Sequence, residues 1–136
     1  MPVNRYNDNW RSYAINAMRD YLRYKKIKKE AQSQKITAQF NKGRGGSGVS
    51  RTTENAAIRT GLTRQQEREF EAVDRALRAA RHLPDGKLRV KVVEMVYIRG
   101  THTIEGAARG VHVSYSTAWR WTDTFIREVG GNLGCD

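Results

Sequence analysis

The sequence predicts an all-α protein, in which a long basic N-terminal helix precedes a helical middle part and a C-terminal helix-turn-helix unit. Three observations predict this class. The 136 residues include only two prolines, which favours long helices. Apolar residues recur three and four positions apart along much of the chain, the spacing of one helix face. Residues that suit helix N-caps stand just before several of these stretches.

Charge and apolar residues are unevenly distributed along the chain. Residues 1–51 hold 7 of the 26 Leu, Ile, Val and Phe residues and carry a net charge of +9, whereas residues 52–136 hold 19 and carry +2. The sequence therefore predicts a basic helical segment at 1–40, a flexible loop at 41–51 and a core-forming helical domain at 52–136. The overall charge of +11 indicates a polyanionic partner, either nucleic acid or an anionic membrane surface.

Composition and spacing also argue against several protein classes. No apolar run approaches 18 residues, and the first residues lack the apolar core of a secretory signal, so we expect no membrane partner. The single cysteine, Cys135, fits a reducing cytosol. His82, His102, His112 and Cys135 have no metal-site spacing. Because no nucleophile–base set or apolar carboxylate pair can be argued for, we expect no cofactor, no metal and no enzymatic activity.

The long N-terminal helix is predicted over residues 10–32. Its apolar stripe consists of Trp10, Ala14, Ala17, Met18, Tyr21 and Tyr24. Lys25, Lys26, Lys28 and Lys29 follow at its expected C-terminal end, where cations suit the helix dipole. They form either a solvated helix end or a contact with DNA phosphates. Arg44, in the glycine-rich loop that follows, is a further candidate for a phosphate contact.

The middle part reads as two helices. The first is predicted over residues 52–60 and is closed by Gly61. Thr63 and Gln66 then match a capping box, which opens a helix that runs to about residue 82. Its apolar stripe consists of Phe70, Val73, Leu77 and Ala80. This stripe is either internal core or a seam that pairs with another helix, and a turn at residues 82–86 follows it.

Residues 87–129 have the layout of a helix-turn-helix unit. Leu88, Val92, Met95 and Val96 lie on one face of a predicted helix over residues 87–98, although the β-branched residues leave a strand over 90–98 as the competing interpretation. Thr103 can cap a short helix over 104–110. Ser114 can cap a longer one that runs to about residue 129.

The longer helix has two distinct faces. Ala118, Trp121, Phe125 and Val129 are predicted to be buried, and Ala107 and Ala108 are predicted to lie where this helix crosses the short one. The opposite face presents residues of the first turns, which a recognition helix directs at base edges. The DNA-binding candidates are Thr103, Ser114, Tyr115, Ser116, Thr117, Trp119 and Arg120, with Lys25, Lys26, Lys28, Lys29 and Arg44 on phosphates. The alternative for Trp119 is packing against the N-terminal helix.

The same region resembles a known family of regulators. The residues that carry the resemblance are Arg89, Glu94, Tyr97, Thr101, Thr103, Ala108, Val111-His112-Val113-Ser114, Thr117-Ala118 and Arg120. In this pattern the chain resembles the C-terminal part of the ArpU/RinA-type phage regulators and is similar to region 4 of the housekeeping sigma factors. Ser50, Thr52, Glu54 and Ala56 fit the same layout, so the resemblance covers about residues 50–129.

The resemblance implies an activator of prophage late genes, those for packaging and structural proteins, that acts in the cytoplasm of the bacterial host cell. It leaves direct contact with bacterial RNA polymerase open. Because one small recognition helix binds DNA weakly, we expect a homodimer or small homo-oligomer on double-stranded DNA. Two alternatives stay open. One is a phage small terminase subunit that binds DNA for packaging, and the other is non-specific nucleic-acid binding through the lysine cluster.

Overall fold

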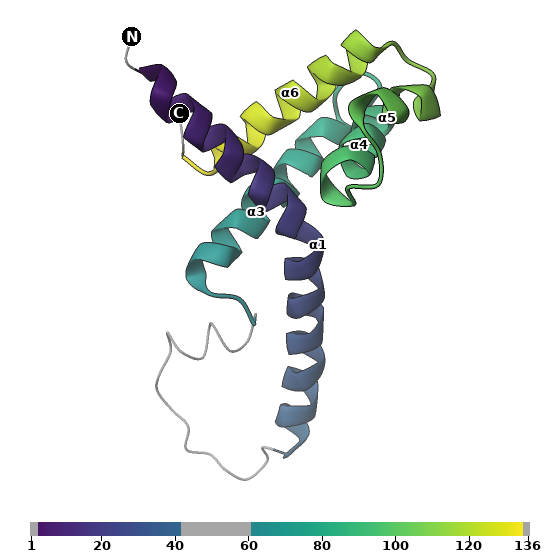
Figure 1. Ribbon diagram of the computed structural model, residues 1–136. Helices are drawn as coiled ribbons and strands as arrows, with labels where there is room; N and C mark the ends of the chain where they lie inside the picture. Colours follow the sequence, from purple (N-terminus) through teal and green to yellow (C-terminus); the bar gives the residue numbers. More distant parts are fainter. Residues whose placement is uncertain (1–2, 42–60, 135–136) are drawn as a thin grey trace.

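The computed structural model describes residues 3–41 and 61–134, with side chains over 9–33 and 61–134, and helices joined by short turns, without a strand, make up this part of the chain (Figure 1). Its elements in chain order are α1 (Val3–Asn41), α3 (Arg64–Arg81), α4 (Gly86–Val93), the π-helical turn η2 (Glu94–Ile98), α5 (Ile104–Val111) and α6 (Tyr115–Asn132). The all-α class is confirmed. Arg44, the helix predicted at 52–60 and all of the predicted loop after Asn41 lie outside the described residues.

Helix starts follow the capping residues of the sequence. The Thr63 side chain accepts a hydrogen bond from the Gln66 N–H, and the Gln66 side chain accepts one from the Thr63 N–H, both at 3.1 Å. At the start of α5 the Thr103 side chain accepts a hydrogen bond from the Gly106 N–H at 3.0 Å, without a reciprocal bond because Gly106 has no side chain. These side chains satisfy donors that a helix leaves unpaired at its first turn. Ser114 caps α6 through the Thr117 N–H at 3.1 Å, so the predicted starts of α3, α5 and α6 are confirmed.

The main core is formed by α1, α3, α4 and α6. The predicted stripe of α1 enters it, as Ala14, Ala17, Met18, Tyr21 and Tyr24 are buried and Trp10 is half-buried. The stripe of α3 enters it too, so Phe70, Val73, Leu77 and Ala80 are internal core. The Tyr21 ring stacks on Phe70 with 5.0 Å between centroids. Burial, together with the hydrogen bond to Asp74 at 2.8 Å, raises the pKa of Tyr21 above its usual range.

A second, smaller core lies between α4, α5 and α6. Its buried residues are Val92, Ala107, Ala108, Val111, Ala118 and Trp121. Leu88, Met95, Val96, Ile104 and Val113 pack around them. The second core is therefore the helix-turn-helix interior that the sequence predicts. Helix α6 enters both cores, because Phe125, Ile126 and Val129 belong to the main one.

Two predicted boundaries are wrong. Helix α1 runs over Val3–Asn41 rather than 10–32, because no glycine or proline interrupts that stretch. The four lysines therefore lie inside the helix, and the helix-dipole argument does not apply to them. The segment predicted as one helix over 87–98 is α4 followed by η2, in which the Arg99 N–H donates to the Glu94 carbonyl five residues back at 2.7 Å. A strand over 90–98 is excluded.

Helix α1 spans the molecule. It crosses α6 and α3 and stays packed against the start of α3 as far as Lys28 and Ala31, and only its C-terminal end extends away from the bundle (Figure 1). At the crossing with α6, a Cβ atom built on Gly130 would lie 2.6 Å from the Trp10 ring. The missing side chain of Gly130 therefore lets the two helices approach. None of the helices over residues 3–41 and 61–134 combines the length and the apolar character that crossing a bilayer requires.

The close approach at Gly130 predicts the outcome of a glycine substitution. We expect Gly130→Ala to lower the free energy of unfolding by about 1–2 kcal/mol, since the added methyl overpacks against Trp10. Gly106→Ala is the matched control in α5, because its Cβ would meet Thr103 Oγ1 only at 3.4 Å. The control should gain up to about 1 kcal/mol from helix propensity. Urea unfolding measures both, and equal stability of the two variants would contradict this packing.

Candidate nucleic-acid interface

The unit formed by α5, a tight turn and α6 is held by small buried residues. Ala107 and Ala118 are fully buried and Ala108 is 2 % exposed, so the two helices pack without bulky side chains between them. His112 ends α5 in the left-handed conformation, with φ of 63°. The Val113 N–H then donates to the Ala108 carbonyl at 3.0 Å, which closes the turn. The turn directs the chain straight into the N-cap of α6.

The face of α6 opposite the core carries the predicted recognition residues. Tyr115 and Trp119 are 55 % and 43 % exposed, and Ser116 and Arg120 are exposed as well. Trp119 belongs to neither apolar core. Its exposure therefore argues against the alternative that it packs against the N-terminal helix. The four residues lie within the first six positions of one helix. The structure therefore brings the predicted base-reading set together on one open surface.

Three of the candidates with hydroxyl groups, Thr103, Ser114 and Thr117, form hydrogen bonds at helix starts. Thr103 Oγ1 accepts from the Gly106 N–H. Ser114 Oγ accepts from the Thr117 N–H at 3.1 Å and donates to Thr117 Oγ1 at 2.9 Å. These bonds order the first turns of α5 and α6. Any contact of these hydroxyls with DNA would be added to the capping role, because their remaining lone pairs stay on exposed surface.

The lysine candidates lie elsewhere. Lys25, Lys26 and Lys29 are exposed, but Lys28 Nζ is 2.9 Å from Glu67 Oε1 and 4.4 Å from the centroid of the Phe70 ring. Lys28 therefore binds within the protein, and the structure does not support its predicted phosphate contact. This stretch of α1 lies on the side of the molecule away from the α5–α6 turn (Figure 1). The structure thus does not join the lysines and the α6 face into one surface.

Two arginines that are not among the predicted site residues fix the orientation of α6. Arg89 donates to the Pro84 carbonyl at 2.8 Å, and its guanidinium carbon lies 5.5 Å from the centroid of the Trp121 ring. Arg11 of α1 binds Asp123 of α6 at 2.8 Å. The sequence offers little signal for either contact, because the partners are 32 and 112 positions apart.

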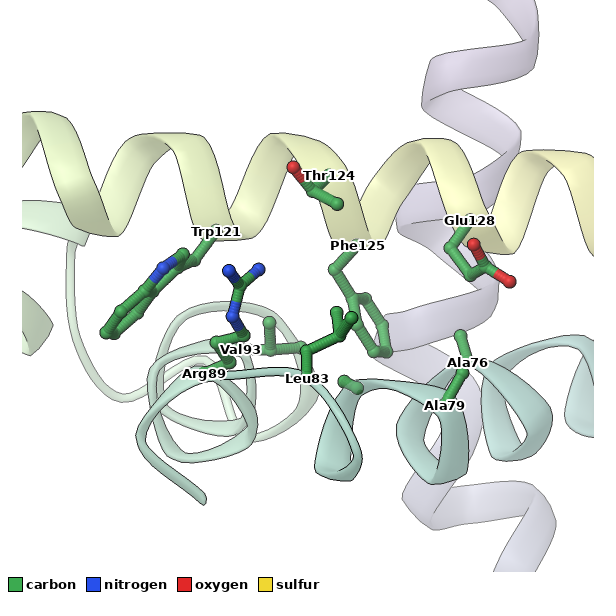
Figure 2. A pocket seen from close by; sticks show the side chains of 10 residues that line it. Ala76, Ala79, Leu83, Arg89, Val93, Trp121, Thr124, Phe125 and Glu128 are labelled. Atoms are coloured by element: carbon green, nitrogen blue, oxygen red, sulfur yellow. The ribbon is translucent and has the colours of Figure 1, made fainter. Parts of the chain in front are cut away.

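An apolar pocket lies where α3, α4 and α6 meet (Figure 2). Figure 2 shows Phe125 and Trp121 directed from α6 toward α3 and α4, with Arg89 reaching up beside Trp121. The rest of the apolar lining consists of Ala76, Ala79, Ala80, Leu83 and Val93. Alanines on α3 leave the space into which Phe125 fits. The pocket is thus part of the seam that anchors α6, and Trp121 and Phe125 lie about 140° and 180° around the helix from Ser116.

Comparisons with protein-family models, with curated proteins and with solved structures find no match for this chain. Within residues 3–41 and 61–134, no group of three or more His, Cys, Asp and Glu side chains is placed to hold a metal ion.

The Asp123 carboxylate ties α1 to α6 in a pH-dependent way. Burial by itself raises the pKa of Asp123, but hydrogen bonds from Arg11 and Arg127 and the charges of both guanidiniums outweigh it, so the pKa lies below its usual value. The Asp123 side chain is only 16 % exposed. A carboxyl whose pKa is lowered by folding stabilises the protein above the unfolded pKa near 4, and this stabilisation is lost as pH falls through the folded pKa.

We therefore expect Asp123→Asn to lower the free energy of unfolding by about 1–2 kcal/mol at pH 7, since two charge-assisted hydrogen bonds are lost from a largely buried side chain. The difference from wild type should shrink as the pH falls below about 4. Glu105→Gln, which breaks the exposed pair with Arg109, is the control and should cost no more than about 0.5 kcal/mol. A cost of Asp123→Asn that stayed constant from pH 7 to pH 3 would contradict this account.

Proposed function

We propose that the protein is a sequence-specific transcriptional regulator that binds double-stranded DNA by placing the N-terminal half of α6 in the major groove. The observation that carries this proposal is the α5–turn–α6 unit, whose outer α6 face gathers Tyr115, Ser116, Trp119 and Arg120. A helix-turn-helix places its second helix in the major groove with the N-terminal residues toward base edges. The basic composition of the chain favours a polyanion as ligand.

The exposed side chains match the chemistry of the groove. The Arg120 guanidinium can bind guanine O6 and N7 in a bidentate manner. It forms no ion pair with any described residue, so no internal contact needs to be broken first. Ser116 can donate to a base or a phosphate, and Trp119 offers an apolar surface to a thymine methyl group. The rigid anchoring of α6 by Arg89 and Asp123 supports this role, since discrimination between bases needs a fixed helix.

The biological role rests on the resemblance described above. By that resemblance, the regulated genes are late genes of a prophage and the protein activates them. Because one small recognition helix binds DNA weakly, the protein would act as a homodimer or small homo-oligomer. Mass measurement in solution separates this role from that of a small terminase subunit, which would form a ring of many copies. The resemblance leaves open whether the bound protein touches RNA polymerase.

The test is a selection of binding sites from random duplexes, followed by affinity measurements on the selected and on a scrambled duplex. We expect Arg120→Ala to cost about 1–3 kcal/mol on the selected duplex and little on the scrambled one. Folding should survive, because no apolar group is removed. Arg75→Ala, which removes an exposed arginine of α3, is the matched control and should leave discrimination unchanged.

Two results would contradict the proposal at different levels. Equal losses of Arg120→Ala on both duplexes would reduce Arg120 to a backbone contact. A selection that enriches no sequence would remove sequence-specific binding altogether.

A further inference from the structure

A second charged surface lies behind the helix-turn-helix, on α4 and η2. An open hollow there is lined by Lys87, Lys91 and Arg99, with Glu94 beside them and Val90 and Met95 in its lining. All three cations are exposed. None of them forms an ion pair with a described residue. The hollow therefore combines unpaired positive charge with apolar carbon, and it retains a net charge of +2 when Glu94 is ionised.

The π-helical turn gathers these cations. Residues 87 and 99 are 12 positions apart, so in an unbroken α-helix they would point about 120° apart. A π-helix closes its hydrogen bonds over five residues, so each residue turns the chain less. In η2 the Arg99 N–H donates to the Glu94 carbonyl. The N–H groups of Thr101 and His102 then both donate to the Met95 carbonyl, at 2.9 and 3.0 Å, which fixes the chain just after Arg99.

The hollow faces away from α6. Arg89 marks the side of α4 that meets α6, because it lies over Trp121 (Figure 2). Lys87 and Lys91 stand two residues before and after Arg89, which places each about 200° around the helix from it. Helix α4 itself therefore separates the hollow from the α6 face. A straight duplex on the outer face of α6 would therefore not lie directly against Lys87 and Lys91, and bending DNA toward them costs energy.

We propose that this hollow is a docking site for an acidic segment of a partner protein, in which carboxylates flank an apolar side chain. The carboxylates would bind Lys87, Lys91 and Arg99, and the apolar side chain would contact Met95 and Val90. A compact phosphate suits the hollow less, since the Glu94 carboxylate repels it and the apolar side chains of Val90 and Met95 offer it no hydrogen bond. An extended segment can spread its charges around Glu94. This site does not depend on what α6 binds, and a regulator so built would hold DNA and a protein partner on opposite sides of α4.

The experiment selects peptides from a random 12-residue library on the full-length protein. The library is first depleted on a variant that carries Lys87→Gln, Lys91→Gln and Arg99→Gln. The control variant carries Arg64→Gln, Arg75→Gln and Arg81→Gln, which removes the same charge from exposed positions of α3. Thermal unfolding verifies that each variant folds. Affinities of a selected peptide are measured by fluorescence anisotropy at 150 mM salt, where the Debye length of about 8 Å screens distant charges.

We expect the enriched peptides to be acidic with at least one large apolar residue. Their affinity should fall about tenfold or more on the hollow variant and less than twofold on the control variant. Enrichment of neutral or basic peptides, no enrichment, or equal losses on both variants would overturn the proposal. Displacement of the peptide by a short DNA duplex bound to the wild-type protein would also overturn it, because the hollow would then belong to nucleic acid. The proposed DNA-binding function is tested without the peptide and can fail separately.

Discussion

Helix α6 is shared between two cores, and the arrangement of the whole protein depends on this sharing. Its first half packs against α5 through Ala118 and Trp121, and its second half packs against α1 and α3 through Phe125 and Val129. A rotation of α6 would expose apolar surface in both cores at once, at a cost of about 25 cal/mol for each square ångström. The outer face of α6 is therefore held in a fixed orientation relative to α1, as the proposed recognition of a base sequence requires.

The same constraint explains why helix-packing positions carry small residues. Ala107 and Ala108 let α6 pack closely against α5, and Gly130 leaves space for the Trp10 ring of α1. Polar contacts then fix the angle between the helices. Asp123 joins α6 to Arg11, and Tyr21 and Tyr24 join α1 to the carboxylates of α3. The basic N-terminal helix, which carries much of the charge, is thus also a structural helix of the main core.

Local signals in the sequence predicted the elements well, and long-range pairings could not be predicted from it. The caps at Thr63, Thr103 and Ser114 and the two faces of α6 follow from residues a few positions apart, so spacing alone reveals them. The engagement of Lys28 by Glu67 depends on how α1 crosses α3, which no local pattern encodes. The π-helical turn was not predicted either, because η2 has only five residues and is too short to change the spacing of apolar residues in a recognisable way. The hollow that Arg99 lines together with Lys87 and Lys91 could therefore not be predicted from the sequence.

The most direct test of the central claim is a titration of the isotope-labelled protein with a selected duplex, followed by amide and side-chain chemical shifts. If α6 enters the major groove, the largest shifts fall on residues 114–120 and on the Trp119 indole N–H, whereas the Trp121 indole, buried between α4 and α6, changes little. Shifts concentrated on Lys25, Lys26 and Lys29 of α1, with residues 114–120 unchanged, would contradict the claim and would assign nucleic-acid binding to the N-terminal helix.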